Sequence, residues 1–300
     1  MITIKHLVIF KEVARVKSMS KAAENLFISQ PTISQKIQEI ENYYHIKLFQ
    51  RFSKSLGISE EGEIFLEHAN KVLMELETLD EIFFYNKENI NIRIGTTLTI
   101  ASTIAPILFH DIQQKHPHLH LQVYVDNTQS IESMLLDNQL DIAIVEGDIH
   151  SDMVVHQPII EDQLALVCSC ENELYQCDTV DPKQLQHQSF VVREKGSGTR
   201  AMLEQFMNIY KLAFHVTWQC HSWESVKQAV IFNHGLSLIS LRLVEKELQE
   251  GLLHVVNIDN WKWDRNFSLC YHKNKAWNPN LETIKQEVIL FSKELKEKQI

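Results

Sequence analysis

Hydroxyl, amide and ammonium side chains crowd the stretch from Ser29 to Glu41, which reads SQPTISQKIQEIE. These groups have the length and hydrogen-bonding capacity to reach base edges and phosphates in a nucleic-acid groove. Three isoleucines in the stretch recur at i, i+4 and i+7, the spacing of one buried helical stripe. The helix would then present these polar side chains on its outer faces: Gln30, Thr32, Ser34, Gln35, Lys36 and Gln38.

The flanking residues predict how this helix is held. Ser29 is a suitable N-cap, and Pro31 is tolerated in the first turn, where an N–H group has no intrahelical partner. Upstream, Ser20 can cap a short helix from Lys21 to Leu26, in which two alanines allow another helix to cross closely. An apolar corner, Leu-Phe-Ile, joins the two helices, and the pair matches a helix-turn-helix. We therefore add Ser20, Lys21 and Pro31 to the predicted DNA contacts.

A basic and aromatic segment, from Asn42 to Gly57, follows the polar helix, and we interpret it as the wing of a winged helix-turn-helix. Its cations, Lys47, Arg51 and Lys54, would hold phosphates, and one of them would enter the minor groove. Its aromatic residues would form the underside of the small core: Tyr43, Tyr44, Phe49 and Phe52.

These segments resemble the N-terminal signature of the LysR-type transcriptional regulators. The similarity runs from IKHLVIFKEVA through SMSKAA and ISQPTISQKI to LFQR, within about the first sixty residues. The resemblance implies a winged helix-turn-helix, a long linker helix and a two-lobed, periplasmic-binding-protein-like α/β effector domain. Two departures weaken the minor-groove assignment: Lys54 stands where a second arginine is common, and Ile58-Ser59 where Leu-Thr is common. An ammonium lacks the fork of a guanidinium.

Charge is divided unevenly along the chain. The whole sequence carries a net charge of −10, but residues 1–60 contain nine Lys and Arg against five Glu, which leaves +4 there and −14 elsewhere. A basic head on an acidic body is expected when one small domain must approach phosphate. The N-terminus lacks a signal-peptide pattern, and no apolar run reaches membrane-spanning length, so we expect a cytoplasmic protein with no membrane partner.

A long helix is predicted from Ser59 to about Tyr85, followed by a polar hinge at 86–89. One row of apolar residues has the 4-3-4-3-4 spacing of a two-stranded coiled coil. We call this row the seam: Phe65, Ala69, Val72, Leu76, Leu79 and Phe83. We expect it to make a homodimer, since two-fold symmetry doubles the DNA site. The alternative is that the helix packs on its own body, and the family resemblance implies a dimer of dimers.

Strand and helix patterns alternate from Ile90 onward, which predicts two α/β lobes with largely parallel sheets. We divide the chain into a DNA-binding head (1–58), a linker helix (59–89) and an effector domain (90–300). Lobe I would comprise about 90–161 and 267–300, and lobe II about 162–266. Two crossover strands, near 161–164 and 263–267, would flank a cleft between the lobes.

Ligands of open α/β sheets bind beyond the carboxyl ends of the strands. In lobe I polar loops follow three strands, and in lobe II the loop REKGSGTR lies between a strand and a helix. This glycine-rich loop could form a nest for an anion, and it resembles the loop of LysR-type regulators that sense small anions. We therefore expect a small anionic effector, bound by Thr96, Thr97, Leu98, Thr99, Asn127, Thr128, Glu146, Ser197, Gly198, Thr199, Arg200 and Trp223.

Other chemistry finds little support in the sequence. The five cysteines are scattered and odd in number, so we expect reduced thiols, with Cys168 and Cys170 on one face of a strand. The histidines of the segment HPHLH sit at a predicted surface turn. We predict no metal site and no cofactor. The glycine-rich loop lacks the spacing of a P-loop, and no catalytic triad or dinucleotide fingerprint is present, so we expect no enzyme.

The resulting hypothesis is a ligand-responsive transcriptional regulator in which lobe closure repositions the DNA-binding heads. Its expected partners are operator DNA, a small anion, further copies of the chain and the transcription machinery. Two alternatives remain open. One is an architectural DNA-binding protein whose C-terminal domain only oligomerises, and the other is an enzyme with an accessory DNA-binding head.

Overall fold

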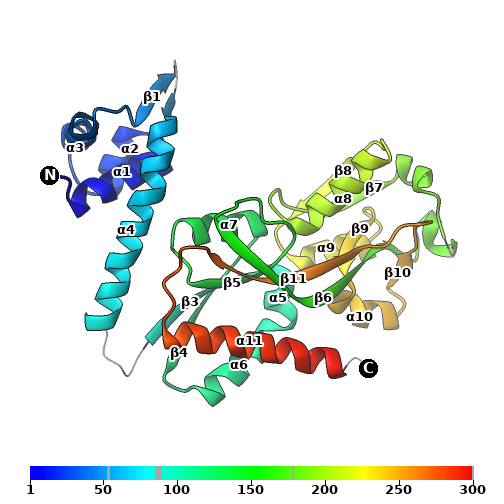
Figure 1. The fold of residues 1–300 in the computed structure, drawn as a ribbon. Helices are drawn as coiled ribbons and strands as arrows, with labels where there is room; N and C mark the ends of the chain where they lie inside the picture. The colour runs from blue at the N-terminus through cyan, green and yellow to red at the C-terminus, as the bar shows by residue number, and fades with distance from the viewer. Residues whose placement is uncertain (53–54, 85–89, 178, 299–300) are drawn as a thin grey trace. The chain divides into compact units, whose positions relative to one another are not determined.

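The computed structural model describes residues 1–52, 55–84, 90–177 and 179–298. The chain forms two compact units, Met1–Asn86 and Lys87–Ile300 (Figure 1). The first unit contains α1 (Ile4–Val16), α2 (Met19–Asn25), α3 (Gln30–Tyr44), the hairpin of β1 (Phe49–Phe52) and β2 (Ser55–Ile58), and α4 (Glu60–Phe84). The predicted isoleucine stripe of α3 is buried against Phe10 and Val13 of α1. This is a winged helix-turn-helix, as the sequence predicts.

The N-terminal caps follow local chemistry, with one correction. The Ser29 hydroxyl accepts a hydrogen bond from the Thr32 N–H, and Pro31 lies in the first turn of α3, as predicted. The cap of α2, however, is Ser18 rather than Ser20, and its hydroxyl accepts from the Lys21 N–H. Ser18 has the extended backbone of a cap residue (φ −155°, ψ 122°), whereas Ser20 already lies in the first turn.

Three aromatic residues are more exposed than the sequence predicts. Phe27, assigned to the apolar corner, lies in the left-handed region at φ 54° and is 95% exposed. Tyr43 and Tyr44, assigned to the underside of the wing, are about half exposed and pack edge to face with each other. Phe65 of α4 packs against the core of the head, and the centroid of its ring lies 4.9 Å from that of the Phe10 ring.

This contact corrects part of the predicted seam. Phe65 and Ala69 belong to the core of the head itself, because α4 packs against α1 over its first turns. Further along, Val72 and Leu79 are 51% and 52% exposed. The side chain of Phe83 and the predicted hinge at 86–89 lie outside the described residues. Of the described seam residues, Val72 and Leu79 are therefore the exposed ones, while Leu76 is half-buried.

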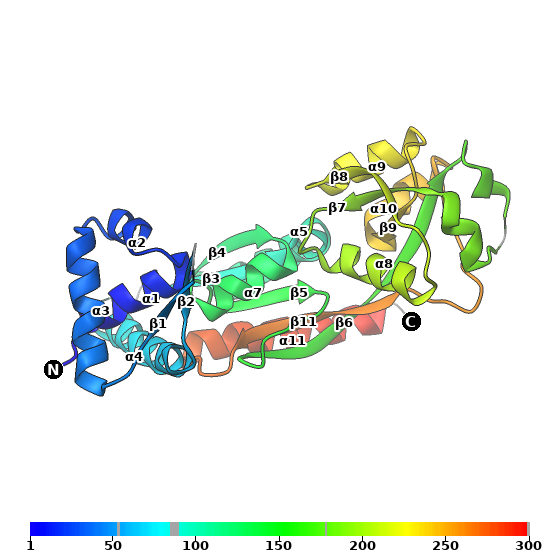
Figure 2. The same ribbon diagram turned by 90° about the horizontal axis from the view of Figure 1, so that it is seen from above.

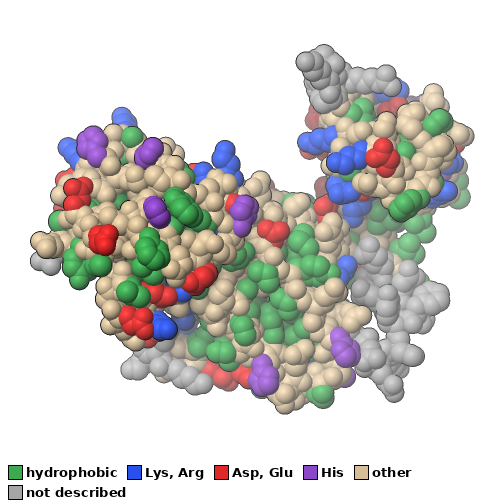
Figure 3. All heavy atoms as spheres, turned by 180° about the vertical axis from the view of Figure 1, so that it is seen from behind, with side chains coloured by type: hydrophobic (Ala, Val, Ile, Leu, Met, Phe, Trp, Pro, Cys, Tyr) green, Lys and Arg blue, Asp and Glu red, His purple; other side chains and the backbone are tan. Residues whose placement is uncertain are grey.

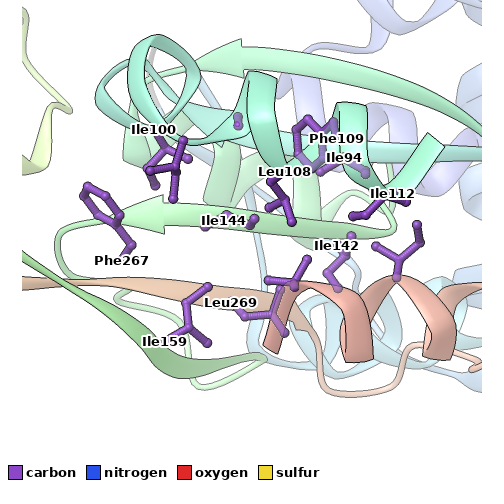
Figure 4. Packing of buried hydrophobic residues seen from close by; sticks show 14 of the residues in the cluster. Ile94, Ile100, Leu108, Phe109, Ile112, Ile142, Ile144, Ile159, Phe267 and Leu269 are labelled. Carbon is purple, nitrogen blue, oxygen red and sulfur yellow. The ribbon is translucent and has the colours of Figure 1, made fainter. Parts of the chain in front are cut away.

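The second unit begins with lobe I, an α/β layer structure. Its sheet has the order β4 (Leu119–Asp126), β3 (Ile90–Thr97), β5 (Ile142–Glu146), β11 (Asp264–His272) and β6 (Val154–Ser169). The first three strands are parallel, and β11 is antiparallel to both β5 and β6. The helices α6 (Ala105–Lys115) and α11 (Pro279–Lys298) cover one face, where isoleucine and leucine side chains interdigitate (Figure 4), and α7 (Thr128–Leu136) covers the other. A short α5 (Leu98–Thr103), absent from the prediction, follows β3.

Lobe II is assembled around the far half of β6. There β6 pairs with β9 (Ser237–Ser240) and β10 (Leu253–Val256), and the parallel pair β7 (Ser189–Arg193) and β8 (His215–Cys220) joins β9 through a bridge. The helix α8 (Gly198–Ile209) packs on one face of these strands, and α9 (Trp223–Ile231) and α10 (Leu241–Gln249) pack on the other. The two short 3-10 helices η1 (Glu173–Gln176) and η2 (Pro182–His187) lie between β6 and β7.

The strand β6 runs through both lobes (Figure 2), and β11 pairs antiparallel with its first part, from Val154 to Gln163; we call this pair the ribbon. The two predicted crossover segments lie side by side within it, since Asp264 is registered with Gln163, and the Leu164 N–H donates to the Trp263 carbonyl at 2.9 Å. The register shifts between Phe267 and Ser268, where the opposite strand carries one extra residue next to Pro158. Such a bulge bends a strand and tolerates proline.

The cysteines and the surface charges complete the description. All five cysteines are free, and Cys168 is buried, whereas Cys170 is exposed. They do not share one strand face, because β6 ends at Ser169. In the space-filling view Lys and Arg side chains gather on the visible face of the head, and Asp, Glu and His side chains are spread over that of the larger unit, together with some Lys and Arg (Figure 3). Within the described part of the chain no helix is long and apolar enough to cross a membrane.

Candidate functional site

The outer surface of α3 carries the side chains predicted to read DNA. Gln30, Ser34, Gln35 and Gln38 are exposed, and Thr32 is half-buried with its hydroxyl 2.8 Å from that of Ser29. The apolar stripe holds the opposite face of α3 in the core, so this polar face is presented outward. On α2 both Ser20 and Lys21 are exposed. A helix whose outer face carries exposed amide and hydroxyl groups fits a major groove.

Two predicted phosphate contacts are already paired with carboxylates. The Lys36 ammonium lies 2.7 Å from Glu39, and the Lys47 ammonium lies 2.7 Å from Glu41. Glu41 also accepts the Leu48 N–H at 2.9 Å and so ties α3 to the start of the wing. Lys54 and the side chain of Arg51 lie outside the described residues.

The cleft between the lobes contains a buried carboxylate. The side chain of Glu146, at the end of β5, accepts hydrogen bonds from the hydroxyls of Thr97 and Thr99, the latter at 2.9 Å. All three residues are almost fully buried. Burial raises the pKa of Glu146 above its ordinary value, although Arg265 nearby acts in the opposite direction. Two of the threonine hydroxyls predicted to bind an effector, those of Thr97 and Thr99, are therefore hydrogen-bonded to the protein's own carboxyl group.

Arg265, which the sequence prediction missed, is the cation at the centre of the cleft. From the ribbon its guanidinium donates to Asp162 at 2.7 Å, to Thr199 of lobe II at 2.8 Å and to Thr99 of lobe I at 3.4 Å. Asp162 has a fully buried side chain and also accepts from the Ser240 hydroxyl. Opposite charges on the two predicted crossover strands were the signal that could have identified this pair.

The two lobes touch directly beside this network. A Cβ atom added to Gly147 would lie 2.7 Å from the Cα of Gly198, and Gly147 has a φ of +90°. The Gln129 N–H also donates to the Gly196 carbonyl across the cleft at 3.3 Å. Next to the contact lies a cavity of about 930 Å³, lined from both lobes and by Arg265. The cleft is closed where the lobes touch, and the cavity lies beside that contact.

The remaining predicted effector residues have different surroundings. Ser197 and Gly198 line the cavity at the start of α8, and the Ser197 side chain makes no cap hydrogen bond. Arg200 also reaches the cavity, but its guanidinium is held within lobe II by Glu204, Gln219 and the Arg193 carbonyl.

In lobe I the Thr128 hydroxyl donates to the Glu146 carbonyl at 2.6 Å, and Asn127 caps α7. Thr96 is fully buried in β3, and its hydroxyl lies 3.5 Å from the Thr97 carbonyl. Leu98 packs against the lobe II core. Trp223 is buried in that core, with the Arg193 guanidinium 4.8 Å above its ring.

The described residues contain no group of three or more His, Cys, Asp or Glu side chains that could hold a metal ion. Within the predicted histidine turn, His116 lies 3.2 Å from Glu287 of α11.

Comparison with known proteins decides between the functional classes. A family model described as the bacterial regulatory helix-turn-helix protein, lysR family, matches residues 4–63, and one described as the LysR substrate binding domain matches residues 87–289, more than half of the chain. The chain belongs to the LysR family. It is therefore a DNA-binding transcriptional regulator with an effector-binding domain, and the predicted family, fold class and functional class are confirmed.

Relatives of this LysR-family regulator cover nearly its whole length. The HTH-type transcriptional regulator YeiE of Escherichia coli is 28% identical over 274 residues, which are 91% of this chain and 92% of that protein. CfxR of Cupriavidus necator is 29% identical over 284 residues, 94% of this chain and 89% of that protein.

Among solved structures, full-length OxyR of Pseudomonas aeruginosa has a TM-score of 0.63 at 18% identity and covers 96% of this chain and 95% of its own. The regulatory domain of Synechocystis CcmR, in complex with 2-PG, has a TM-score of 0.63 at 22% identity and covers 68% of this chain and 97% of its own. At these identities the likeness concerns the fold.

Proposed function

We propose that this LysR-family regulator binds a small anionic metabolite between lobes I and II, and that binding repositions its DNA-reading heads. The observation that carries the proposal is the Arg265 guanidinium, which lines the cavity and donates to a threonine of each lobe. A guanidinium offers five N–H donors in a fixed fork, so it can exchange a hydroxyl partner for a carboxylate or phosphate oxygen. A solved relative, the CcmR regulatory domain, is a complex with 2-PG.

The protonation state of Glu146 affects whether an anion can bind beside Arg265. An ionised carboxylate beside Arg265 would repel it, but burial favours the protonated form of Glu146, which carries no charge. The neutral acid would also release a threonine hydroxyl more readily than the carboxylate would. The effector site then comprises Thr97, Thr99 and Thr128 on one side, Ser197 and Thr199 on the other, and Arg265 between them.

Binding becomes regulation only if the effector prefers one arrangement of the lobes. A ligand shifts a conformational equilibrium by the difference between its affinities for the two states. Because the described cleft is closed, an anion inserted between Gly147 and Gly198 would change the angle between the lobes. We further propose that the protein acts in the cytoplasm as a homodimer or dimer of dimers, is not an enzyme and meets the transcription machinery at its operator.

Calorimetric titration of the full-length protein with sulfate, phosphoesters and small carboxylates tests the proposal. Arg265→Gln should weaken binding of the responding anion about ten- to a hundredfold, the usual effect of removing a charge-assisted hydrogen bond. Lys227→Gln is the matched control, since Lys227 is paired with Glu247 in lobe II. An equal loss in both variants, or no binding of any anion, would contradict the proposed site.

A further inference from the structure

Glu39 of α3 holds two side chains of the DNA-reading surface. Its carboxylate accepts the Gln35 amide N–H at 2.9 Å and the Lys36 ammonium at 2.7 Å. Gln35 and Lys36 lie one turn before Glu39, at i−4 and i−3, where helical side chains meet. The network therefore lies within the surface that faces DNA and is built from adjacent turns of one helix.

A residue from another helix braces the same carboxylate. The His6 Nε2 lies 2.8 Å from Glu39, and the Thr3 backbone N–H donates to His6 Nδ1 at 3.2 Å. Because a backbone N–H can only donate, Nδ1 is the acceptor, and the ring proton lies on Nε2, directed at Glu39. His6 is 5% exposed, so the brace comes from the core of the head. Glu39 is thus fixed from behind while it holds Gln35 and Lys36 in front.

We infer that Glu39 is a positioning residue that sets which bases Gln35 reads and how much charge Lys36 offers to phosphate. An ionised carboxylate accepts hydrogen bonds but cannot donate them, so the amide nitrogen of Gln35 must face Glu39. The amide oxygen and the second N–H of that nitrogen are then left to contact a base, in an orientation that Glu39 fixes. In the described part of the chain no donor contacts that oxygen.

This orientation predicts a base preference. A glutamine pairs with adenine through two bonds, because its oxygen accepts from N6 and one N–H donates to N7. The Gln35 nitrogen has two N–H groups, so donating one to Glu39 leaves the other free for N7 while the oxygen faces N6. The wild-type protein should therefore favour adenine at the position that Gln35 contacts. Releasing Gln35 from Glu39 should weaken this preference, because the amide is then free to rotate and is no longer held ready for both bonds.

Selection from a pool of DNA duplexes with a randomised centre tests the base preference with the full-length protein. Gln35→Ala identifies the position, because preference there should disappear. At that position the wild type should favour adenine over cytosine about five- to 150-fold, the discrimination expected of a bidentate pair, and Glu39→Ala should lower this ratio. An unchanged adenine-to-cytosine ratio in Glu39→Ala would overturn the inference, and so would a Gln35→Ala variant that keeps the wild-type preference. A residue with a purely structural role would alter affinity without changing which base is chosen.

The charge effect has a separate test, which also serves if Glu39→Ala fails to fold. Glu39→Gln keeps the shape of the side chain but leaves Lys36 without its ion pair. On one duplex of fixed random sequence, log K against log salt should steepen by about 0.9, the contribution of one additional neutralised phosphate. Glu75→Gln, an exposed change on α4, removes the same charge and should leave the slope unchanged. Equal slopes for the wild type and Glu39→Gln, or equal steepening in both variants, would overturn this part of the inference.

Discussion

Two carboxyl groups with oppositely shifted pKa values lie in the two proposed functional regions of this regulator. On α3 the hydrogen bonds from Lys36 and His6 lower the pKa of Glu39 to about 2, so Glu39 is ionised throughout the physiological range. In the cleft, burial raises the pKa of Glu146, whose carboxyl group accepts from the neutral hydroxyls of Thr97 and Thr99. Glu39 is therefore a constant hydrogen-bond acceptor, whereas burial disfavours the charged form of Glu146.

The raised pKa of Glu146 predicts a dependence of stability on pH. For an acid whose pKa is higher in the folded state, the stabilisation is complete below the ordinary value of 4.5 and is lost as pH rises through the folded value. The glutamine of Glu146→Gln cannot ionise. The free energy of unfolding of this variant should therefore increase relative to that of the wild type as pH rises from 5 to 8. Urea unfolding at several pH values measures this difference. Parallel pH profiles would show that Glu146 is ionised in the folded protein.

Glu41 predicts a second effect at the same scale. Its carboxylate is the acceptor for the N–H of Leu48, a fully buried residue at the entrance to the wing. Glu41→Ala leaves that N–H without its partner, which should lower the free energy of unfolding by about 1–3 kcal/mol. Glu24→Ala, on exposed α2, provides the control and should change stability much less. Equal unfolding midpoints for the wild type and Glu41→Ala would contradict this role.

The elements could be predicted from sequence wherever burial imposes a period. The isoleucines of α3 and the apolar runs of β3 and β5 are buried as predicted, because a helix or strand has only one way to present them to a core. The site residues were harder to predict. Arg265 contacts Asp162 over 103 positions and Thr99 over 166. Opposite charges on the two predicted crossover strands signal the first contact, but no local pattern encodes the second. The hydrogen bond from the Thr97 hydroxyl to Glu146 likewise depends on tertiary structure.

The helix α8 meets lobe I at Gly198. A Cβ atom there would lie 2.8 Å from the Gly147 Cα and 2.9 Å from the Glu146 carbonyl oxygen. Backbone cannot yield as a flexible side chain can, so Gly198→Ala should separate the lobes and cost about 1–3 kcal/mol of stability. Hydrogen exchange should show faster exchange at the Gln129 amide, which donates across the cleft. Wild-type exchange at this amide would mean that the contact adapts without opening.

The exposed seam residues predict how α4 is used. Leu79→Asp places a charge on a half-exposed apolar position. If two α4 helices pair there, the buried carboxylate should weaken the dimer by several kcal/mol and shift sedimentation toward the monomer. Leu290→Asp on α11, a residue of similar exposure, should leave assembly intact. Normal assembly of a folded Leu79→Asp protein would exclude the seam as the essential dimer contact.

At the scale of the whole molecule, the proposed regulation changes the spacing of the DNA-binding heads and leaves unchanged which DNA sequence each head prefers. The proposed effector site lies in the second compact unit, whereas the residues proposed to read bases lie in the first. Adding the responding anion should therefore change the extent of a footprint on a selected operator without changing base preference within a half-site. Selection from the randomised pool with and without the anion measures both quantities. An anion that binds but leaves the footprint unchanged would break the proposed link between cleft and head.

The ribbon limits how the lobes can move. Nine registered residue pairs join β6 to β11, and Arg265 is fixed within this ladder beside Asp162. Between the lobes, residues 161–163 are paired with residues 264–266, so these segments must bend or twist together, whereas two separate single strands could rotate independently. The bulge near Pro158 lies within the sheet of lobe I, where Phe267 and Ser268 are also paired with β5. We expect the paired segments to bend elastically, so that the lobes return to one resting angle when an effector leaves, without any hydrogen bond of the ladder having to break.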